Sequence, residues 1–270
     1  MNAEDLIPIK ESFIIILDSR NGKIMNKNYL SDVLFEFESL IFDDRSISIN
    51  ASVLSFICPN SIYVINEYNN LLVIDHDNMI YKYYIPYGNY NAITFTEILK
   101  TILPLNFILT LNTNNNKFIL TYLTDFTIKK ESNINEIMGF GKNIDYISSY
   151  NSLIFPFTCN FNGLNSFNIC LESVNTNNLD SYTLSQSSII QSINIDNNKS
   201  IINFIKTNDY NFKIQIKYID DIHITIRDNN NNLINFNNQH WNLTLLFNIL
   251  IDKPRFEYNN SFLNIVNKNK

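Results

Sequence analysis

Three histidines, His76, His223 and His240, are the side chains of this chain best suited to bind a metal or to transfer a proton near neutral pH. The most suggestive setting is Asp75-His76-Asp77-Asn78, where two carboxylates flank an imidazole. This segment lacks the glycine and the distal glutamate of a calcium-binding loop, so we expect a solvated turn in preference to a metal site. His223 alternates with isoleucines, which places it on the outer face of a strand, and His240 precedes Trp241 at a strand entry.

Paired carboxylates are a second candidate for chemistry, and they occur as Asp43-Asp44 and Asp220-Asp221. The first pair lies beside Arg45 in an expected turn, and the second interrupts a strand. No glycine-rich phosphate loop, Gly-x-Ser-x-Gly elbow or His/Glu zinc motif is present in the sequence. We therefore predict no catalytic residue, no cofactor and no metal, and we expect a protein that is not an enzyme. A hydrolase built on a β-sandwich is the remaining enzymatic alternative, because a fold does not fix a function.

The composition of the chain limits its partners. Twenty Lys and Arg against 26 Asp and Glu give a net charge of −6, which disfavours broad electrostatic binding of nucleic acid. Cys58, Cys159 and Cys170 lie in apolar runs without metal spacing, and this indicates reduced thiols in a cytosolic setting. We expect no signal peptide and no membrane span, because the chain begins with acidic residues and has no apolar run of about 18 residues.

Alternation of apolar and polar residues predicts β-strands through most of the chain, and it is clearest between Phe212 and Ile249. We expect the apolar members to face a core, with Trp241 as a core anchor and a short strand at 233–236. The apolar series is Phe212, Ile214, Ile216, Tyr218, Ile222, Ile224, Ile226, Trp241, Leu243, Leu245, Phe247 and Ile249. Such short, regularly spaced strands favour a sandwich or a barrel.

Residues 86–142 have a different sequence pattern, which predicts a helix followed by a hairpin. Thr94 and Glu97 form a capping-box pattern, so we predict that Thr94 caps a helix that ends before Pro104. A hairpin at 107–111 and 118–123 follows, and one helical turn at 133–138 is closed by Gly139. The hairpin predicted at 71–74 and 80–85 is assigned to the preceding β region.

The order of these pieces resembles the penton (vertex) and minor capsid proteins of virophages, Polinton-like viruses and related large DNA viruses. The resemblance covers about residues 10–250. Its motifs, in order, are Ser-Ile-Tyr-Val-Ile-Asn at 61–66, Ile85-Pro86-Tyr87-Gly88-Asn89-Tyr90, the helix at 94–103, Asn-Lys-Phe-Ile-Leu at 116–120, Ile137-Met138-Gly139-Phe140, and the alternating series from Ile222 to Leu245. Turns in which the family has glycine are mostly asparagine here.

The resemblance implies an all-β protein, a single jelly-roll β-sandwich with a small α+β insertion made of a helix plus a hairpin. The implied division is a discontinuous jelly roll at 1–85 and 143–253, an insertion at 86–142 and a C-terminal tail at 254–270. It also implies a structural capsid protein that is made in the host cytoplasm, resides in the virion, forms homopentamers at icosahedral vertices and contacts the major capsid protein.

The polar side of the 212–249 segment is then a candidate subunit interface, and we assign it Lys213, Gln215, Lys217 and Thr225. The alternative function is a vertex-associated receptor- or glycan-binding sandwich. In that case the tyrosines at 81–84 and 87–90 would stack on sugars, although core packing explains such residues as well.

Overall fold

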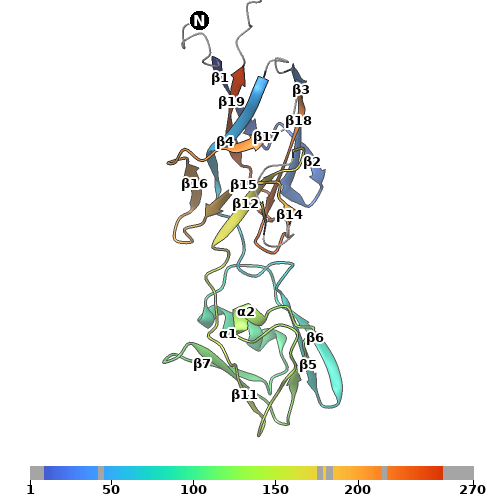
Figure 1. The fold of residues 1–270 in the computed structure, drawn as a ribbon. Helices are drawn as coiled ribbons and strands as arrows, with labels where there is room; N and C mark the ends of the chain where they lie inside the picture. The colour runs from blue at the N-terminus through green and yellow to red at the C-terminus, as the bar shows by residue number, and fades with distance from the viewer. Residues whose placement is uncertain (1–8, 42–45, 175–178, 181–184, 215–217, 252–270) are drawn as a thin grey trace, which may run out of the picture.

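The computed structural model describes residues 9–41, 46–174, 179–180, 185–214 and 218–251. The chain forms two lobes, a β-sandwich and a smaller α+β lobe, joined by two connections (Figure 1). Within the described residues, neither helix has the length and apolar character needed to cross a membrane.

One sheet of the sandwich, called here the β1 sheet, has the order β1-β19-β4-β16, with β17 also paired to β4. All its pairings are antiparallel. Its strands are β1 (Ile9–Asp18), β4 (Ser46–Pro59), β16 (Ile201–Ile205), β17 (Phe212–Ile214) and β19 (Asn242–Ile251).

The facing sheet, called here the β3 sheet, has the order β15-β12-β18-β3-β2 and is also antiparallel. Its strands are β2 (Lys23–Asn26), β3 (Tyr29–Ile41), β12 (Ser166–Leu171), β15 (Ile189–Asn194) and β18 (Tyr218–Arg227). A separate two-stranded ribbon pairs β13 (Leu179–Asp180) with β14 (Ser185–Gln186).

The pairing of these strands is nested along the chain. β1 pairs with β19, β3 with β18, β4 with β16, and β12 with β15, so the outermost strands in sequence pair first and the innermost pair last. Eight strands rolled in this order into two packed sheets form a jelly roll. The expected fold class, an all-β single jelly roll with a small α+β insertion, is confirmed.

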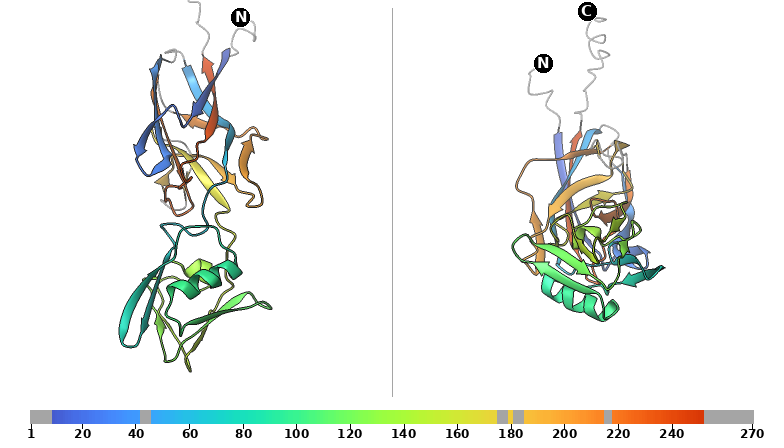
Figure 2. Two further views of the ribbon diagram at one scale, coloured as in Figure 1. Left: turned by 180° about the vertical axis from the view of Figure 1, so that it is seen from behind. Right: turned by 90° about the horizontal axis from the view of Figure 1, so that it is seen from below.

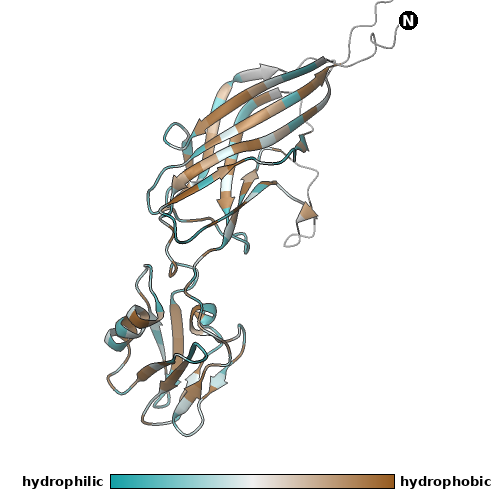
Figure 3. Cartoon of the chain, turned by 90° about the vertical axis from the view of Figure 1, so that its left-hand side faces the viewer, coloured by the Kyte–Doolittle hydropathy of each residue, from teal (hydrophilic) through white to brown (hydrophobic). Residues whose placement is uncertain are grey.

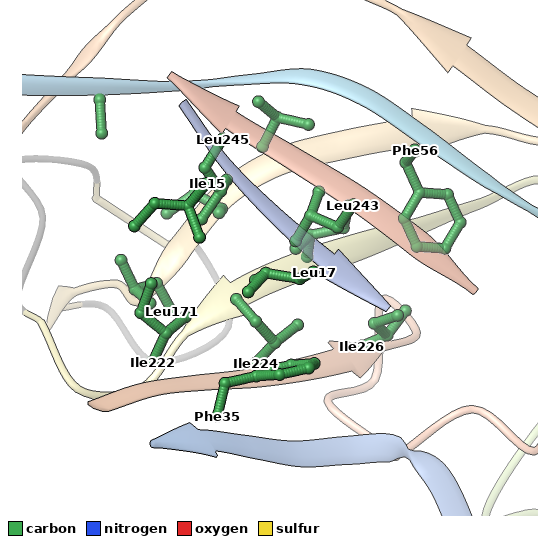
Figure 4. Packing of buried hydrophobic residues seen from close by; sticks show 14 of the residues in the cluster. Ile15, Leu17, Phe35, Phe56, Leu171, Ile222, Ile224, Ile226, Leu243 and Leu245 are labelled. Carbon is green, nitrogen blue, oxygen red and sulfur yellow. The ribbon is translucent and has the colours of Figure 1, made fainter. Parts of the chain in front are cut away.

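The core of the sandwich is filled by the inward-facing members of the alternating series (Figure 4). Leu243 and Leu245 from the β1 sheet meet Ile222, Ile224 and Ile226 from the β3 sheet. Along the strands of both sheets the ribbon is mostly hydrophobic, whereas the loops are hydrophilic (Figure 3). The core position predicted for Trp241 is correct.

Trp241 shows why this core can accept a polar atom. The side chain is fully buried, and its indole N–H donates a hydrogen bond to the carbonyl oxygen of Leu30 at 2.7 Å. Its ring packs against Phe35 and Phe56, at centroid distances of 6.0 and 6.1 Å. The one polar group is therefore satisfied while the ring fills the space between the sheets.

The second lobe is inserted between β4 and β12 and has its own core (Figure 1). One of its sheets has the order β10-β9-β5-β6 and the other β11-β8-β7. Helix α1 packs beside β7. Its elements are β5 (Leu71–His76), β6 (Met79–Tyr84), α1 (Ala92–Ile102), β7 (Ile108–Asn112), β8 (Lys117–Thr121), β9 (Thr127–Ile128), α2 (Asn135–Met138), β10 (Tyr146–Ile147) and β11 (Ser152–Ile154).

The boundaries expected at 86 and 142 differ from this packing. Leu72 and Ile74 of β5 and Leu153 of β11 belong to the core of the second lobe, which includes buried residues from Ile65 to Phe155. The hairpin of β5 and β6 is present as predicted, but it pairs with β9 of the insertion instead of joining the jelly roll. Alternation shows that one face of a strand is buried, and it does not show against which partner.

Two local predictions need correction. Asn91, not Thr94, caps α1: its side-chain oxygen accepts the backbone N–H of Ile93 and of Thr94, both at 3.0 Å, while Thr94 Oγ1 accepts the N–H of Asn91. The strand expected at 233–236 is reduced to one isolated bridge between Leu233 and Arg227.

Other local predictions hold. The hairpin of β7 and β8 is present, and the helical turn at 135–138 is closed by Gly139 in the left-handed conformation. The cysteines described by the structure are free, and Cys58 and Cys170 are buried. Burial raises the pKa of the Cys58 thiol to about 12 and that of Cys170 to about 11, which makes both thiols unreactive at neutral pH.

Candidate functional site

The outer face of the β1 sheet carries isoleucines that no part of the described chain covers. In β1, Ile15 and Leu17 point into the core, and the alternate residues Ile14 and Ile16 point outward, with Ile16 74% exposed. At the other side of the sheet, Ile201 and Ile205 of β16 are exposed in the same way, Ile205 by 64%. Ile57 of β4 lies between them.

We call this surface the isoleucine face and define it by Ile14, Ile16, Ile57, Ile201 and Ile205. The register places Leu246 of β19 beside Ile14, whereas Thr244 and Ser55 lie between Ile16 and Ile205 in the row that crosses the sheet. The three strands β4, β16 and β19 contain no charged residue. The charges of this face lie at its margins, and one of them, Asp18, is paired with Arg20, which lowers the pKa of the Asp18 carboxyl to about 2.

The outer face of the β3 sheet is of the opposite kind. Asp32 Oδ1 and His223 Nε2 lie 2.7 Å apart. Glu172 Oε1 accepts a hydrogen bond from Thr225 Oγ1 at 2.5 Å and one from the Arg227 guanidinium at 3.3 Å. Ionisable side chains on this face thus pair with one another and are only partly exposed.

The residues predicted as an interface do not form one surface. Lys213 is exposed on β17, on the outer side of the β1 sheet and opposite Asn50. Thr225 lies on β18 in the other sheet, is 1% exposed and donates its hydroxyl to Glu172, so it offers nothing to a partner. Gln215 and Lys217 lie outside the described residues. Of the two predicted residues that the structure describes, Lys213 lies on the same side of the sheet as the isoleucine face and Thr225 does not.

The turn at 75–78 uses its histidine for packing. His76 is buried, with its ring 4.4 Å from that of Tyr81 and 5.1 Å from that of Phe107. Its Nε2 lies 2.9 Å from the Tyr83 hydroxyl, and its Nδ1 lies 3.1 Å from Asp77 Oδ2. Among the residues that the structure describes, no group of His, Cys, Asp and Glu is arranged to hold a metal ion. The expected solvated turn is thus half correct, since Asp77 is exposed and His76 is not.

The tyrosines at 81–84 and 87–90, proposed to stack on sugars, include both packed and exposed residues. Tyr81 and Tyr83 stack around His76. Tyr90 donates its hydroxyl to the carbonyl oxygen of Pro86 and packs on Phe95. Tyr84 and Tyr87 are exposed.

Sequence reasoning missed the isoleucine face, although two signals for it are present. The apolar run Phe13–Leu17 has no alternation, which is typical of a strand that is covered on both faces. The second signal is the lack of charge over 46–59, 201–205 and 242–251. The sequence could not show that these segments are neighbours in one sheet.

Comparison with known proteins identifies a solved structure of similar shape. No family model and no curated protein matches the chain. The similar solved structures include the selenomethionine-labelled mavirus penton protein, with 12% identity and a TM-score of 0.47 over 89% of this chain and 99% of that one. The fold assigned above rests on the nested strand order of this chain.

Proposed function

We propose that this protein is a structural subunit of a viral capsid, located in the virion as a homopentamer at icosahedral vertices and in contact with the major capsid protein. Two features support the proposal. The chain is a single jelly roll, an architecture used by viral capsid proteins among others. The ordered motifs from 61–66 to 222–245 resemble those of penton and minor capsid proteins.

The isoleucine face is the observation that carries the proposal. The exposed isoleucines form two groups, Ile14 with Ile16 and Ile57 with Ile201 and Ile205, and uncharged polar side chains lie between them. The centres of interfaces are depleted in charged residues in the same way. Full burial of an isoleucine side chain contributes about 1.5–3 kcal/mol. In a monomer these isoleucine side chains remain exposed to water. A second copy of the chain packed on this face would bury them.

The shape of the molecule leaves this face accessible to a neighbour. The paired ends of β1 and β19, at Ile9 and Ile251, lie at the end of the jelly roll away from the insertion lobe (Figures 1 and 2). The sides of the sandwich are therefore free of the second lobe. A ring of identical subunits joins two different patches of each copy, so the isoleucine face would meet another surface of the next subunit.

The test compares oligomeric states by native mass spectrometry. We expect a pentamer for the unmodified protein and a monomer for the double variant Ile16→Asp/Ile205→Asp, because each aspartate would leave an unpaired charge in the interface. The matched control is Ile147→Asp/Ile154→Asp, which changes two equally exposed isoleucines of the insertion lobe.

We expect the control variant to remain pentameric and the test variant to lose association by more than about 100-fold in dissociation constant, which corresponds to about 2.7 kcal/mol. An unmodified protein that is monomeric at all concentrations would contradict the proposed assembly. A test variant that still forms pentamers would exclude the isoleucine face as the interface.

A further inference from the structure

A cleft of about 610 Å³ lies where the two lobes meet. Its walls come from the connection at 62–69, from residues 130–137 with helix α2, and from the jelly-roll turn at 228–237. The volume is within the range of about 300–1,000 Å³ that is usual for small-molecule sites.

The lining of the cleft is rich in amides and aromatic rings. Ten of its 27 lining residues are asparagines, and three are tyrosines, Tyr63, Tyr68 and Tyr87. Each tyrosine is exposed, Tyr87 by 52%. An asparagine amide can donate and accept hydrogen bonds at the same time, which matches a hydroxyl group, and a tyrosine ring offers an apolar face.

Asn135 points to a ligand most directly. It is only 2% exposed, yet it lines the cleft, and its side-chain amide makes no hydrogen bond to any described residue. Its backbone oxygen accepts the N–H of Gly139 at 2.8 Å and of Phe140 at 2.9 Å, which fixes the position of the residue. By contrast, the nearby Asn133 side chain is engaged by the backbone N–H of Leu71. The buried side-chain atoms without a partner in the described residues belong to Ser31 and Ser52, so the amide of Asn135 is open to the cleft, where a ligand can pair with it.

The charges around the cleft select against anions. Four carboxylates line it, those of Glu67, Glu131, Glu136 and Asp228, against the two ammonium groups of Lys130 and Lys142. Lys142 is already paired with Glu136 at 3.0 Å. A phosphate, a nucleotide or an acidic sugar would meet net negative charge.

We propose that this cleft binds a neutral carbohydrate of one or two sugar units. The amide of Asn135 would pair with a sugar hydroxyl at the base of the cleft, and Tyr87 would stack on the apolar C–H face of the ring. The proposal does not depend on assembly into a capsid, so the two can fail separately.

The test is saturation-transfer NMR on the full-length protein with four probes: lactose, methyl mannoside, methyl N-acetylglucosaminide and the acidic trisaccharide sialyllactose. We expect transfer to at least one neutral probe, and weaker or no transfer to sialyllactose. Asn135→Leu and Tyr87→Ala should each weaken the affinity for that neutral probe by about 3- to 10-fold, the usual effect of losing one hydrogen bond or contact.

Two controls match these variants. Tyr150→Ala removes a tyrosine that is 97% exposed outside the cleft, and Asn114→Leu changes an exposed asparagine in the β7–β8 turn. Both should bind as the unmodified protein does, with unchanged circular dichroism. The proposal is overturned if no neutral probe binds, if sialyllactose binds best, or if folded Tyr87→Ala protein keeps full affinity.

Discussion

Individual residues with chemical potential serve the packing of this protein. The Asp77 carboxylate, at the tip of the β5–β6 hairpin, accepts hydrogen bonds from Tyr122 at 2.6 Å and from Thr124 at 3.2 Å. Together with the His76 ring these contacts tie β5 to the segment after β8. An Asp-His-Asp turn that resembles a metal site in sequence is therefore a structural clasp.

This clasp predicts a pH dependence. The hydrogen bond to Asp77 is the main cause that raises the pKa of Tyr122 to about 12, above the ordinary value of about 10 for tyrosine. The stabilisation of the fold by the Tyr122–Asp77 hydrogen bond is complete below pH 10 and is lost as the pH rises through 12, where Tyr122 ionises in the folded protein. The same contact lowers the pKa of Asp77, whose stabilisation is present above the ordinary aspartate value and is lost as the pH falls below it.

Carbon-13 NMR of labelled tyrosine rings measures the effect. We expect one late-titrating signal to vanish in Tyr122→Phe and to shift toward pH 10 in Asp77→Asn. Tyr29 provides an internal control, because its pKa is raised by burial and by bonds to Tyr68 and Glu67, away from Asp77. An unchanged late signal in Asp77→Asn would contradict the clasp.

At the level of single residues, the alternation of apolar and polar residues predicted which side chains face the core. Trp241 was assigned correctly to the core, because it heads an alternating series. Thr225 was assigned wrongly to an exposed interface, because its burial depends on Glu172, which is 53 positions away in the chain. Asn135 carried no signal, since asparagine is common throughout this sequence.

Elements were predictable where their signals are local. The hairpins at 71–84 and 108–121 and the glycine-closed turn at 135–138 follow from turn chemistry that lies within a few residues. The partners of these elements were not predictable, and the β5–β6 hairpin was assigned to the wrong lobe for that reason.

The end of α2 gives a prediction for one element. Gly139 has φ of 86°, and a Cβ placed there would lie 2.3 Å from the carbonyl oxygen of Phe157. Gly139→Ala should therefore destabilise the insertion lobe by at least about 1–3 kcal/mol, the usual cost of such backbone strain. Gly88→Ala is the matched control, because its nearest contact is a movable Tyr90 side chain at 3.3 Å.

Urea denaturation followed by two signals measures this change. The one tryptophan, Trp241, lies in the jelly-roll core, so its fluorescence reports that lobe, whereas circular dichroism reports both lobes. We expect Gly139→Ala to lower the midpoint of part of the dichroism signal and to leave the fluorescence midpoint nearly unchanged. Equal shifts of both signals would show that the two cores unfold as one unit.

The whole molecule has two properties that no local pattern gives. One is the nested strand order, which sequence reasoning reached only through a resemblance. The other is the contrast between the two sheets, one whose outer face exposes isoleucines and has its charges at the margins, and one whose outer face carries paired ionisable side chains. Both depend on which distant strands become neighbours. The proposed assembly follows from this contrast, since the exposed isoleucines gain most from being covered.

Cryo-electron microscopy of purified virus particles from the source of this sequence tests the capsid assignment most directly. We predict five copies of the jelly roll around each icosahedral vertex, with the isoleucine face buried against the neighbouring copy. Peptides of this chain should also be found in the same particles by mass spectrometry. Particles that lack the chain, or vertex density that fits the jelly roll only with Ile16 and Ile205 facing solvent, would contradict the account.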